Sequence, residues 1–115
     1  MNPKIRAILE HMLEDAIDAM QFAIDMGTPE LLATDKRNRK AIVMSILNIG
    51  ELAKQLPHEY RTQHNTIPWK NIIRMRERAA HGYHIMNNDI VWDVVINHLP
   101  ILSQFLHNEL TCKSY

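Results

Sequence analysis

The chain has 115 residues, of which 46% are hydrophobic and 23% are charged, which suits one folded domain and excludes a disordered chain. Thirteen basic residues balance thirteen acidic ones, so the overall charge predicts no nucleic-acid partner, and such a prediction has to come from a local patch. The single cysteine, Cys112, excludes an internal disulfide framework and favours a reducing compartment.

The chain shows no sign of a membrane segment. No apolar run reaches the roughly 18 to 20 residues that cross a bilayer, and the first six residues lack the apolar block of a signal peptide. We therefore expect a cytoplasmic protein without membrane contact. We also expect one helical domain over residues 1–110 and a flexible C-terminal tail over residues 111–115.

The first helix is predicted from Asn2, a good N-cap residue, and from Pro3, which suits the first helical position. Apolar residues follow at steps of three and four, and Gly27 is a typical C-terminal stop. The predicted inward stripe consists of Ile5, Leu9, Met12, Ala16, Ala19, Met20 and Ala23.

The second long helix is predicted to begin at a cap formed by Thr34 or Asp35 and to end near Leu56, before Pro57. It is apolar over much of its circumference, which predicts a central place in a bundle. Gly50 within it costs roughly 1 kcal/mol relative to alanine. We expect the close approach of another helix to be the reason for that glycine.

The C-terminal half predicts two more long helices and a short one near residues 58–64. Pro68 suits the first position of the third long helix, with Trp69 as an anchor. Asn87 or Asn88 can cap the last helix, which Pro100 should kink. The fold class predicted is an all-α antiparallel helical bundle of four to five helices.

The stretch of residues 74–83 concentrates three arginines, His81 and Tyr83 near the predicted end of the third long helix. On a helical wheel, Arg76 falls in the middle of the apolar stripe. A buried guanidinium needs a partner, so Arg76 either meets a carboxylate or lines a cleft or subunit interface. Glu51, next to Gly50, is a candidate partner.

His81 follows Arg76 by five residues, which places it about 140° further round a continuous helix. The two side chains can cooperate only under one of two conditions. Either the helix ends or bends near Ala80, for which Gly82 is a reason, or the two residues act across two subunits.

The chemistry available to these residues is RNA cleavage without a metal. A histidine gains and loses a proton near neutral pH, and an arginine can hold a phosphate with two hydrogen bonds. Lys70, Arg74 and Arg78 add positive charge around Arg76, against one acidic residue, Glu77. The alternative is a solvated basic helix face with a single ion pair.

Three other functional roles are disfavoured. His81 and His84 have a spacing that can bind a metal on a helix, but no third ligand accompanies them, so we expect no metal and no cofactor. Cys112 lies in the predicted tail, which disfavours a role as nucleophile. Trp69 and Trp92 are interpreted as packing anchors rather than as platforms for stacking RNA bases.

The spacing Arg76-x4-His81-x-Tyr83 resembles the Arg-x4-His-x-Tyr motif of the HepT-like (DUF86) toxin family in the HEPN superfamily. Three further segments are similar to family segments: residues 49–51 (Ile-Gly-Glu), residues 67–69 (Ile-Pro-Trp) and residues 90–92 (Ile-Val-Trp). Together they span most of the chain in the same order.

This resemblance implies a helical bundle that forms a homodimer, with the two motif helices meeting at a composite cleft. It implies a metal-independent endoribonuclease toxin of a toxin–antitoxin pair, in which Arg76 orients the RNA phosphate and His81 is the acid and base. The partner implied is a minimal nucleotidyltransferase antitoxin. That partner would transfer AMP to Tyr83 and so block RNA from the cleft.

Glu77 departs from the family pattern, in which many members have asparagine after the arginine. A carboxylate at this position can pair with Arg74 or Arg78 and weaken the attraction for RNA. The alternative function is therefore a weakly active or non-catalytic interaction protein that binds a nucleotidyltransferase or RNA.

Overall fold

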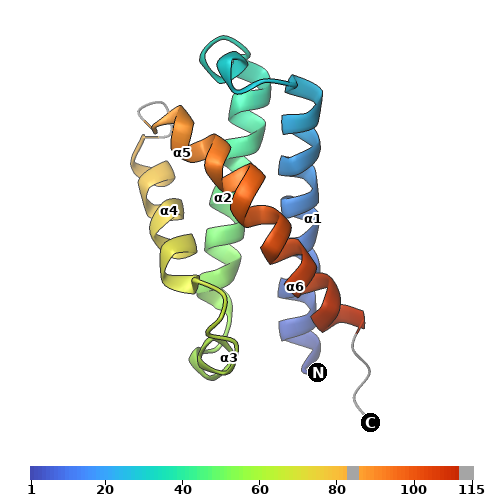
Figure 1. Ribbon diagram of the computed structural model, residues 1–115. Helices are drawn as coiled ribbons and strands as arrows, with labels where there is room; N and C mark the ends of the chain where they lie inside the picture. The colour runs from blue at the N-terminus through green and yellow to red at the C-terminus, as the bar shows by residue number, and fades with distance from the viewer. Residues whose placement is uncertain (83–85, 112–115) are drawn as a thin grey trace.

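The computed structural model describes residues 1–82 and 86–111, and this part of the chain is helical with no strand. The longer helices are α1 (Pro3–Met26), α2 (Lys36–Gln55), α4 (Trp69–Gly82) and α6 (Leu99–Thr111). Shorter elements connect them: η1 (Pro29–Ala33), α3 (His58–Gln63), α5 (Asn88–Asp93) and η3 (Val94–His98). The longer helices alternate in direction (Figure 1), and the all-α prediction is confirmed.

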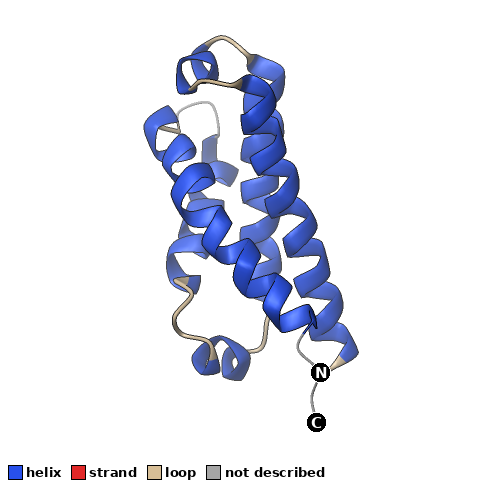
Figure 2. Ribbon diagram, turned by 45° about the vertical axis from the view of Figure 1, so that its right-hand side comes forward, coloured by secondary structure: helices blue, strands red, loops and turns tan. Residues whose placement is uncertain are grey.

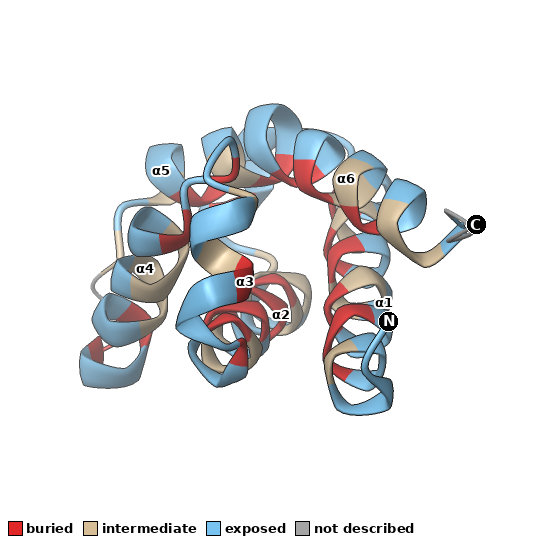
Figure 3. Cartoon of the chain, turned by 90° about the horizontal axis from the view of Figure 1, so that it is seen from below, coloured by how far each residue is buried: buried red, intermediate tan, exposed pale blue. Residues whose placement is uncertain are grey.

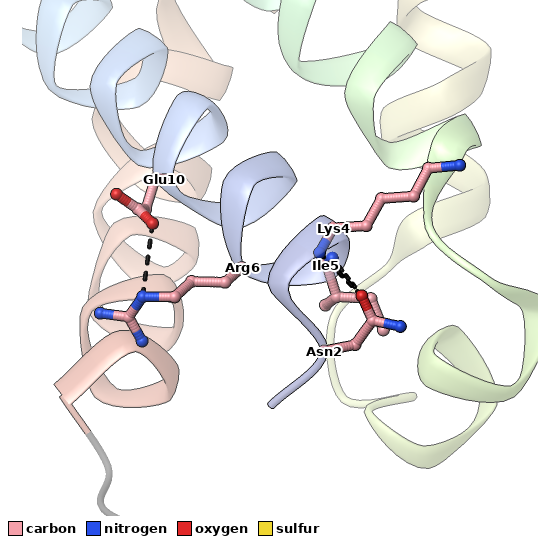
Figure 4. Close-up of polar contacts among 5 residues, drawn as sticks. All are labelled: Asn2, Lys4, Ile5, Arg6 and Glu10. Carbon is pink, nitrogen blue, oxygen red and sulfur yellow. Dashed lines mark hydrogen bonds and ion pairs between the residues drawn. The ribbon is translucent and has the colours of Figure 1, made fainter.

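The ends of the helices follow the local signals in the sequence. Asn2 Oδ1 accepts hydrogen bonds from the backbone N–H groups two and three residues later, at 2.7 and 3.4 Å (Figure 4). Gly27 ends α1 with a φ of 87°, a conformation that favours glycine. Asp35, rather than the threonine before it, caps α2, and Asn87 caps α5. Pro68 comes just before α4 instead of at its first position.

Helix α2 is the centre of the fold, as its wide apolar stripe predicts. It packs against α1 on one side and α4 on the other, while α6 crosses α1 (Figure 1). The buried faces of α1, α2 and α6 turn toward one another (Figure 3). The α2 residues in this core are Ile42, Val43, Ile46, Ile49 and Ala53. Helix α4 packs chiefly on α2, which leaves much of its surface open.

The last helix is interrupted before Pro100 rather than at it. Residues 94–98 form a π-helical turn, and α5, η3 and α6 follow one another without a loop (Figure 2). Proline lacks an N–H group, and its ring excludes the carbonyl four residues earlier from normal helical packing. The wider π-helical turn relieves this conflict. The irregularity that Pro100 predicts therefore lies in the turn before the proline and not at the proline itself.

A group of polar and aromatic side chains ties α3 to α6. The hydroxyl of Tyr60 donates a hydrogen bond to Glu109 Oε1 at 2.7 Å, and Nε2 of His64 lies 3.4 Å from the same oxygen. Trp69 is buried, donates its indole N–H to the His64 carbonyl oxygen at 3.0 Å, and lies edge-on to Phe105. The interpretation of Trp69 as a packing anchor is therefore confirmed.

Replacing Tyr60 with phenylalanine should lower the free energy of unfolding by about 1–2 kcal/mol, because Glu109 loses its hydrogen-bond donor. Burial first, and Glu109 second, raise the pKa of the Tyr60 hydroxyl above its ordinary value of 10.0. The unfolded chain therefore releases this proton at lower pH than the folded chain does. The resulting stability is complete below pH 10.0 and is lost as the pH rises above it.

Urea unfolding of the wild type and of Tyr60→Phe, at roughly pH 8 and pH 11, measures both effects. The wild type should lose more stability between the two values than the variant does. An equal loss in both proteins would contradict the prediction.

Two expectations from the sequence concern the C-terminal tail and the absence of a membrane-spanning helix. Thr111 is the last residue of α6, and the rest of the predicted tail, including Cys112, lies outside the described residues. In residues 1–82 and 86–111, no helix combines the length and the apolarity needed to span a bilayer.

Candidate functional site

Arg76 lies at a close approach of α4 to α2. A Cβ atom built on Gly50 would lie 2.2 Å from Cβ of Arg76, and 3.0 Å from its Cγ and from the carbonyl oxygen of Ile72. Real side-chain atoms do not approach this closely, so only glycine at position 50 allows the contact. The prediction that Gly50 permits the close approach of another helix is confirmed.

Glu51, the carboxylate that the sequence offered as a candidate partner, lies against Arg76. Its Oε2 atom is 2.9 Å from Nε of Arg76, and the two side chains are 43% and 27% exposed, respectively. Both atoms are buried, and their alignment is too poor for a hydrogen bond. The contact is thus an ion pair that compensates a guanidinium on the inward side of α4.

The end or bend near Ala80, one of the two conditions under which Arg76 and His81 could cooperate, is absent. Helix α4 continues through His81 and Gly82, and Gly82 is buried. Within the described part of the chain, Gly27 is the one glycine with a positive φ. Glycine lowers helix propensity by about 1 kcal/mol, which packing readily overrides. Within one chain, His81 therefore stays about 140° round the helix from Arg76.

The exposed His81 instead shares a row along α4 with the predicted RNA-binding residues. Lys70, Arg74, Arg78 and His81 are separated by four, four and three residues, which places them on one helix face. Lys70, Arg74 and Arg78 are exposed as well. This face carries positive charge that no described ion pair neutralises, and it can bind the phosphates of a polyanion.

Three of these residues, Arg74, Arg78 and His81, line one surface hollow. Its other walls come from α4, from α5 and from the two residues before α5: Met75, Glu77, Gly82, Met86, Asn87 and Ile90. Glu77 therefore lies in the same hollow as the two arginines, where it opposes anion binding. Arg76 is not part of this hollow.

Tyr83 and His84 lie outside the described residues, so the predicted modification site and the second histidine of the metal alternative have no described geometry. Among residues 1–82 and 86–111, no group of three or more histidine, cysteine, aspartate or glutamate side chains is arranged to hold a metal ion. The described candidate residues offer proton transfer and phosphate binding.

A second polar hollow lies on the other side of Glu51, and sequence reasoning missed it. His11, Glu14 and Asp15 of α1 line it together with Asn48, Glu51 and Leu52 of α2. Burial raises the pKa of Asp15, while a hydrogen bond with Asn48 opposes that rise. The helical spacing on each helix was visible in the sequence, but the pairing of the two helices was not.

The fold and the site define a small all-helical protein with one cationic, histidine-bearing helix face. Residues 4–109 match the family model described as Ribonuclease HepT-like, and the chain belongs to this family. The family predicted from the motif segments is therefore confirmed.

Three relatives illustrate the similarity. "Putative RNase MJ0127" of Methanocaldococcus jannaschii is 38% identical over 96 residues, which cover 84% of this chain and 78% of that protein. "Putative RNase TTE0752" of Caldanaerobacter subterraneus is 31% identical, covering 86% and 88%. "Probable ribonuclease HepT" of Thermococcus cleftensis is 30% identical, covering 78% and 84%. No solved structure matches the chain.

Proposed function

We propose that this protein is a metal-independent endoribonuclease toxin of a toxin–antitoxin pair. The ribonuclease names of its relatives and its membership of the Ribonuclease HepT-like family support RNA as the substrate. One observation carries the proposal. A single continuous helix, α4, holds Arg76 firmly against α2 while it presents His81 to solvent beside Arg74 and Arg78.

In this proposal His81 removes the proton from a ribose 2′-hydroxyl, whose oxygen then attacks the adjacent phosphorus. The bond from phosphorus to the 5′-oxygen breaks, and the leaving oxygen takes up a proton from the protonated His81. The products are a 2′,3′-cyclic phosphate and a 5′-hydroxyl. Arg76 binds the non-bridging oxygens and stabilises their developing charge. Lys70, Arg74 and Arg78 hold neighbouring phosphates.

A homodimer is part of the proposal, because Arg76 and His81 point to different sides of α4 within one chain. A second subunit can bring its His81 to Arg76 and form a composite cleft, as the family implies. An apolar groove between α4 and the α5–α6 run supports an interface here. Ile90 and Ile101 border this groove and are 40% and 64% exposed, which favours their burial in a dimer.

The partner in this proposal is a minimal nucleotidyltransferase antitoxin that transfers AMP to Tyr83. The phenolic oxygen of Tyr83 attacks the α-phosphorus of ATP, and pyrophosphate leaves. Tyr83 directly follows Gly82, which lines the hollow with His81. Negative charge and bulk added at Tyr83 would repel RNA.

A non-catalytic interaction protein is the second candidate, and Glu77 favours it. Its carboxylate belongs to the same hollow as Arg74, Arg78 and His81, and it reduces the positive potential that RNA requires. Such a protein would bind a nucleotidyltransferase or RNA without cutting it.

The purified protein should cut RNA in the presence of EDTA, since no step of the proposed reaction uses a metal. Co-expressed with a nucleotidyltransferase encoded beside its gene, it should gain the mass of one adenylate and stop cutting RNA. Tyr83→Phe should prevent both changes, whereas Tyr115→Phe should allow both. Intact-mass spectrometry and a gel assay of RNA cleavage measure these results.

Two outcomes would contradict parts of this proposal. A stable complex with the nucleotidyltransferase, without RNA cleavage under any condition, would favour the interaction protein. An adenylate on a peptide that lacks Tyr83 would show that the modified residue is wrongly assigned.

A further inference from the structure

Arg76 is fixed at two points along its side chain. Its Cβ lies against the backbone of Gly50, and its Nε lies 2.9 Å from Glu51 Oε2. Nε is also the buried nitrogen of the guanidinium. No hydrogen bond joins either terminal amino nitrogen to the described residues, and Nε, not these nitrogens, is the atom that is buried without a hydrogen-bond partner. One edge of the guanidinium is therefore engaged and the other is open.

We infer that Glu51 is a positioning residue, which holds Arg76 by Nε so that its terminal amino groups face the RNA phosphate. A guanidinium has a fixed fork of five N–H donors, and its two terminal nitrogens match two oxygens of a phosphate. A carboxylate at Nε leaves that outer edge available. This inference rests on the proposed ribonuclease function and assigns one more residue to the same site.

The energetic reason is preorganisation. A free arginine side chain carries about 2 kcal/mol of rotamer entropy, part of which is lost whenever the side chain is ordered on a phosphate. Gly50 and Glu51 order Arg76 before RNA binds. The rotamer entropy of Arg76 is therefore not lost again when the transition state forms. Orientation of this kind affects the chemical step more than the affinity for RNA.

The opposite role for Glu51 would be that of a competitor, because a carboxylate next to an arginine also repels phosphate. The two roles predict opposite changes in activity. A competitor, when removed, leaves Arg76 freer to bind RNA, so KM falls and kcat is kept. A positioning residue, when removed, leaves Arg76 disordered, so kcat falls and KM changes little.

The test compares RNA cleavage by the wild type, Glu51→Ala, Glu51→Gln and Glu14→Gln. Glu51→Ala should lower kcat about tenfold with little change in KM, and Glu51→Gln should recover part of kcat because its amide oxygen keeps partial negative charge and similar bulk beside Nε. Glu14→Gln is the matched control: Glu14 lines the same hollow as Glu51 but has no ion pair with Arg76. It should behave as the wild type does.

An Arg76→Lys background separates positioning from general charge. Lysine keeps the positive charge but has no guanidinium fork. Glu51→Ala should therefore cause little further loss of kcat in that background. An equal tenfold loss there would overturn the inference, and so would an unchanged or higher kcat/KM for Glu51→Ala in the Arg76 protein.

A second measurement does not depend on activity. In ¹⁵N NMR spectra, the Nε–H signal that disappears in Arg76→Lys belongs to Arg76. This proton should exchange slowly with water in the wild type and in Glu14→Gln, and faster in Glu51→Ala. If the wild type cuts no RNA, the proposed function fails, and this exchange rate alone decides whether Glu51 positions Arg76. An unchanged rate would overturn the inference.

Discussion

Replacing His81 with alanine should lower the rate of RNA cleavage by about 10²–10⁴-fold, which is the usual contribution of a general acid or base. The fold should survive, because the His81 side chain is exposed on α4 and no described contact depends on it. Single-turnover cleavage of a labelled RNA in EDTA measures the rate, and thermal unfolding followed by circular dichroism checks the fold.

His107→Ala is the matched control, since His107 is an exposed histidine on α6 and its backbone carbonyl, not its ring, bonds to Thr111. It should cut RNA at the wild-type rate. If His81→Ala retained full cleavage activity, the acid–base role proposed for His81 would be wrong, although the fold assignment would stand.

Mixing two inactive variants tests whether the site is shared between subunits. In a heterodimer of His81→Ala and Arg76→Ala, one composite cleft keeps both wild-type residues and the other loses both. Co-expression of the two variants should therefore restore part of the activity that each homodimer lacks. Absence of any recovery in purified heterodimers would place Arg76 and His81 of one chain in the same site.

Gly50→Ala should destabilise the protein by about 1–3 kcal/mol, even though alanine favours a helix over glycine by about 1 kcal/mol. The added methyl group would lie 2.2 Å from Cβ of Arg76, so α4 has to move away from α2. That movement also pulls Arg76 from Glu51, and cleavage should fall with stability. Urea unfolding measures the loss of free energy.

A double-mutant cycle isolates the cause of this loss. Arg76→Gly removes the Cβ atom that the new methyl group meets, so Gly50→Ala should cost less in the Arg76→Gly protein than in the wild type. The remaining cost comes from the Ile72 carbonyl oxygen, at 3.0 Å from the added atom. Equal costs in both backgrounds would show that the close approach of Arg76 is not the cause.

Much of the fold was predictable from the sequence, because it depends on interactions within a few residues. The caps at Asn2, Asp35 and Asn87 bond to backbone N–H groups two or three positions away, and Gly27 supplies a local left-handed turn. Helical periodicity identified the central helix and placed Arg76 on an inward face, since position on a helix follows from spacing alone.

Part of the candidate site was predictable for the same reason. Gly50 in the middle of a helix required a compensating contact, and Glu51 beside it was one carboxylate able to reach Arg76. The sequence did not show that both features serve the same arginine. That coincidence depends on the register between α2 and α4, which long-range packing determines.

The sequence by itself therefore determined the longer helices, most of their ends and the family, and it supplied the candidate residues of the proposed site. Tertiary structure decided that α4 includes Ala80 and His81 and reaches Gly82, that a π-helical turn precedes Pro100, and that His81 lines a hollow with Arg74 and Arg78 instead of Arg76. The physical reason is the relative size of two free energies, that of local helix propensity and that of long-range packing. One glycine changes helix propensity by about 1 kcal/mol, and packing between segments far apart in the chain outweighs that preference.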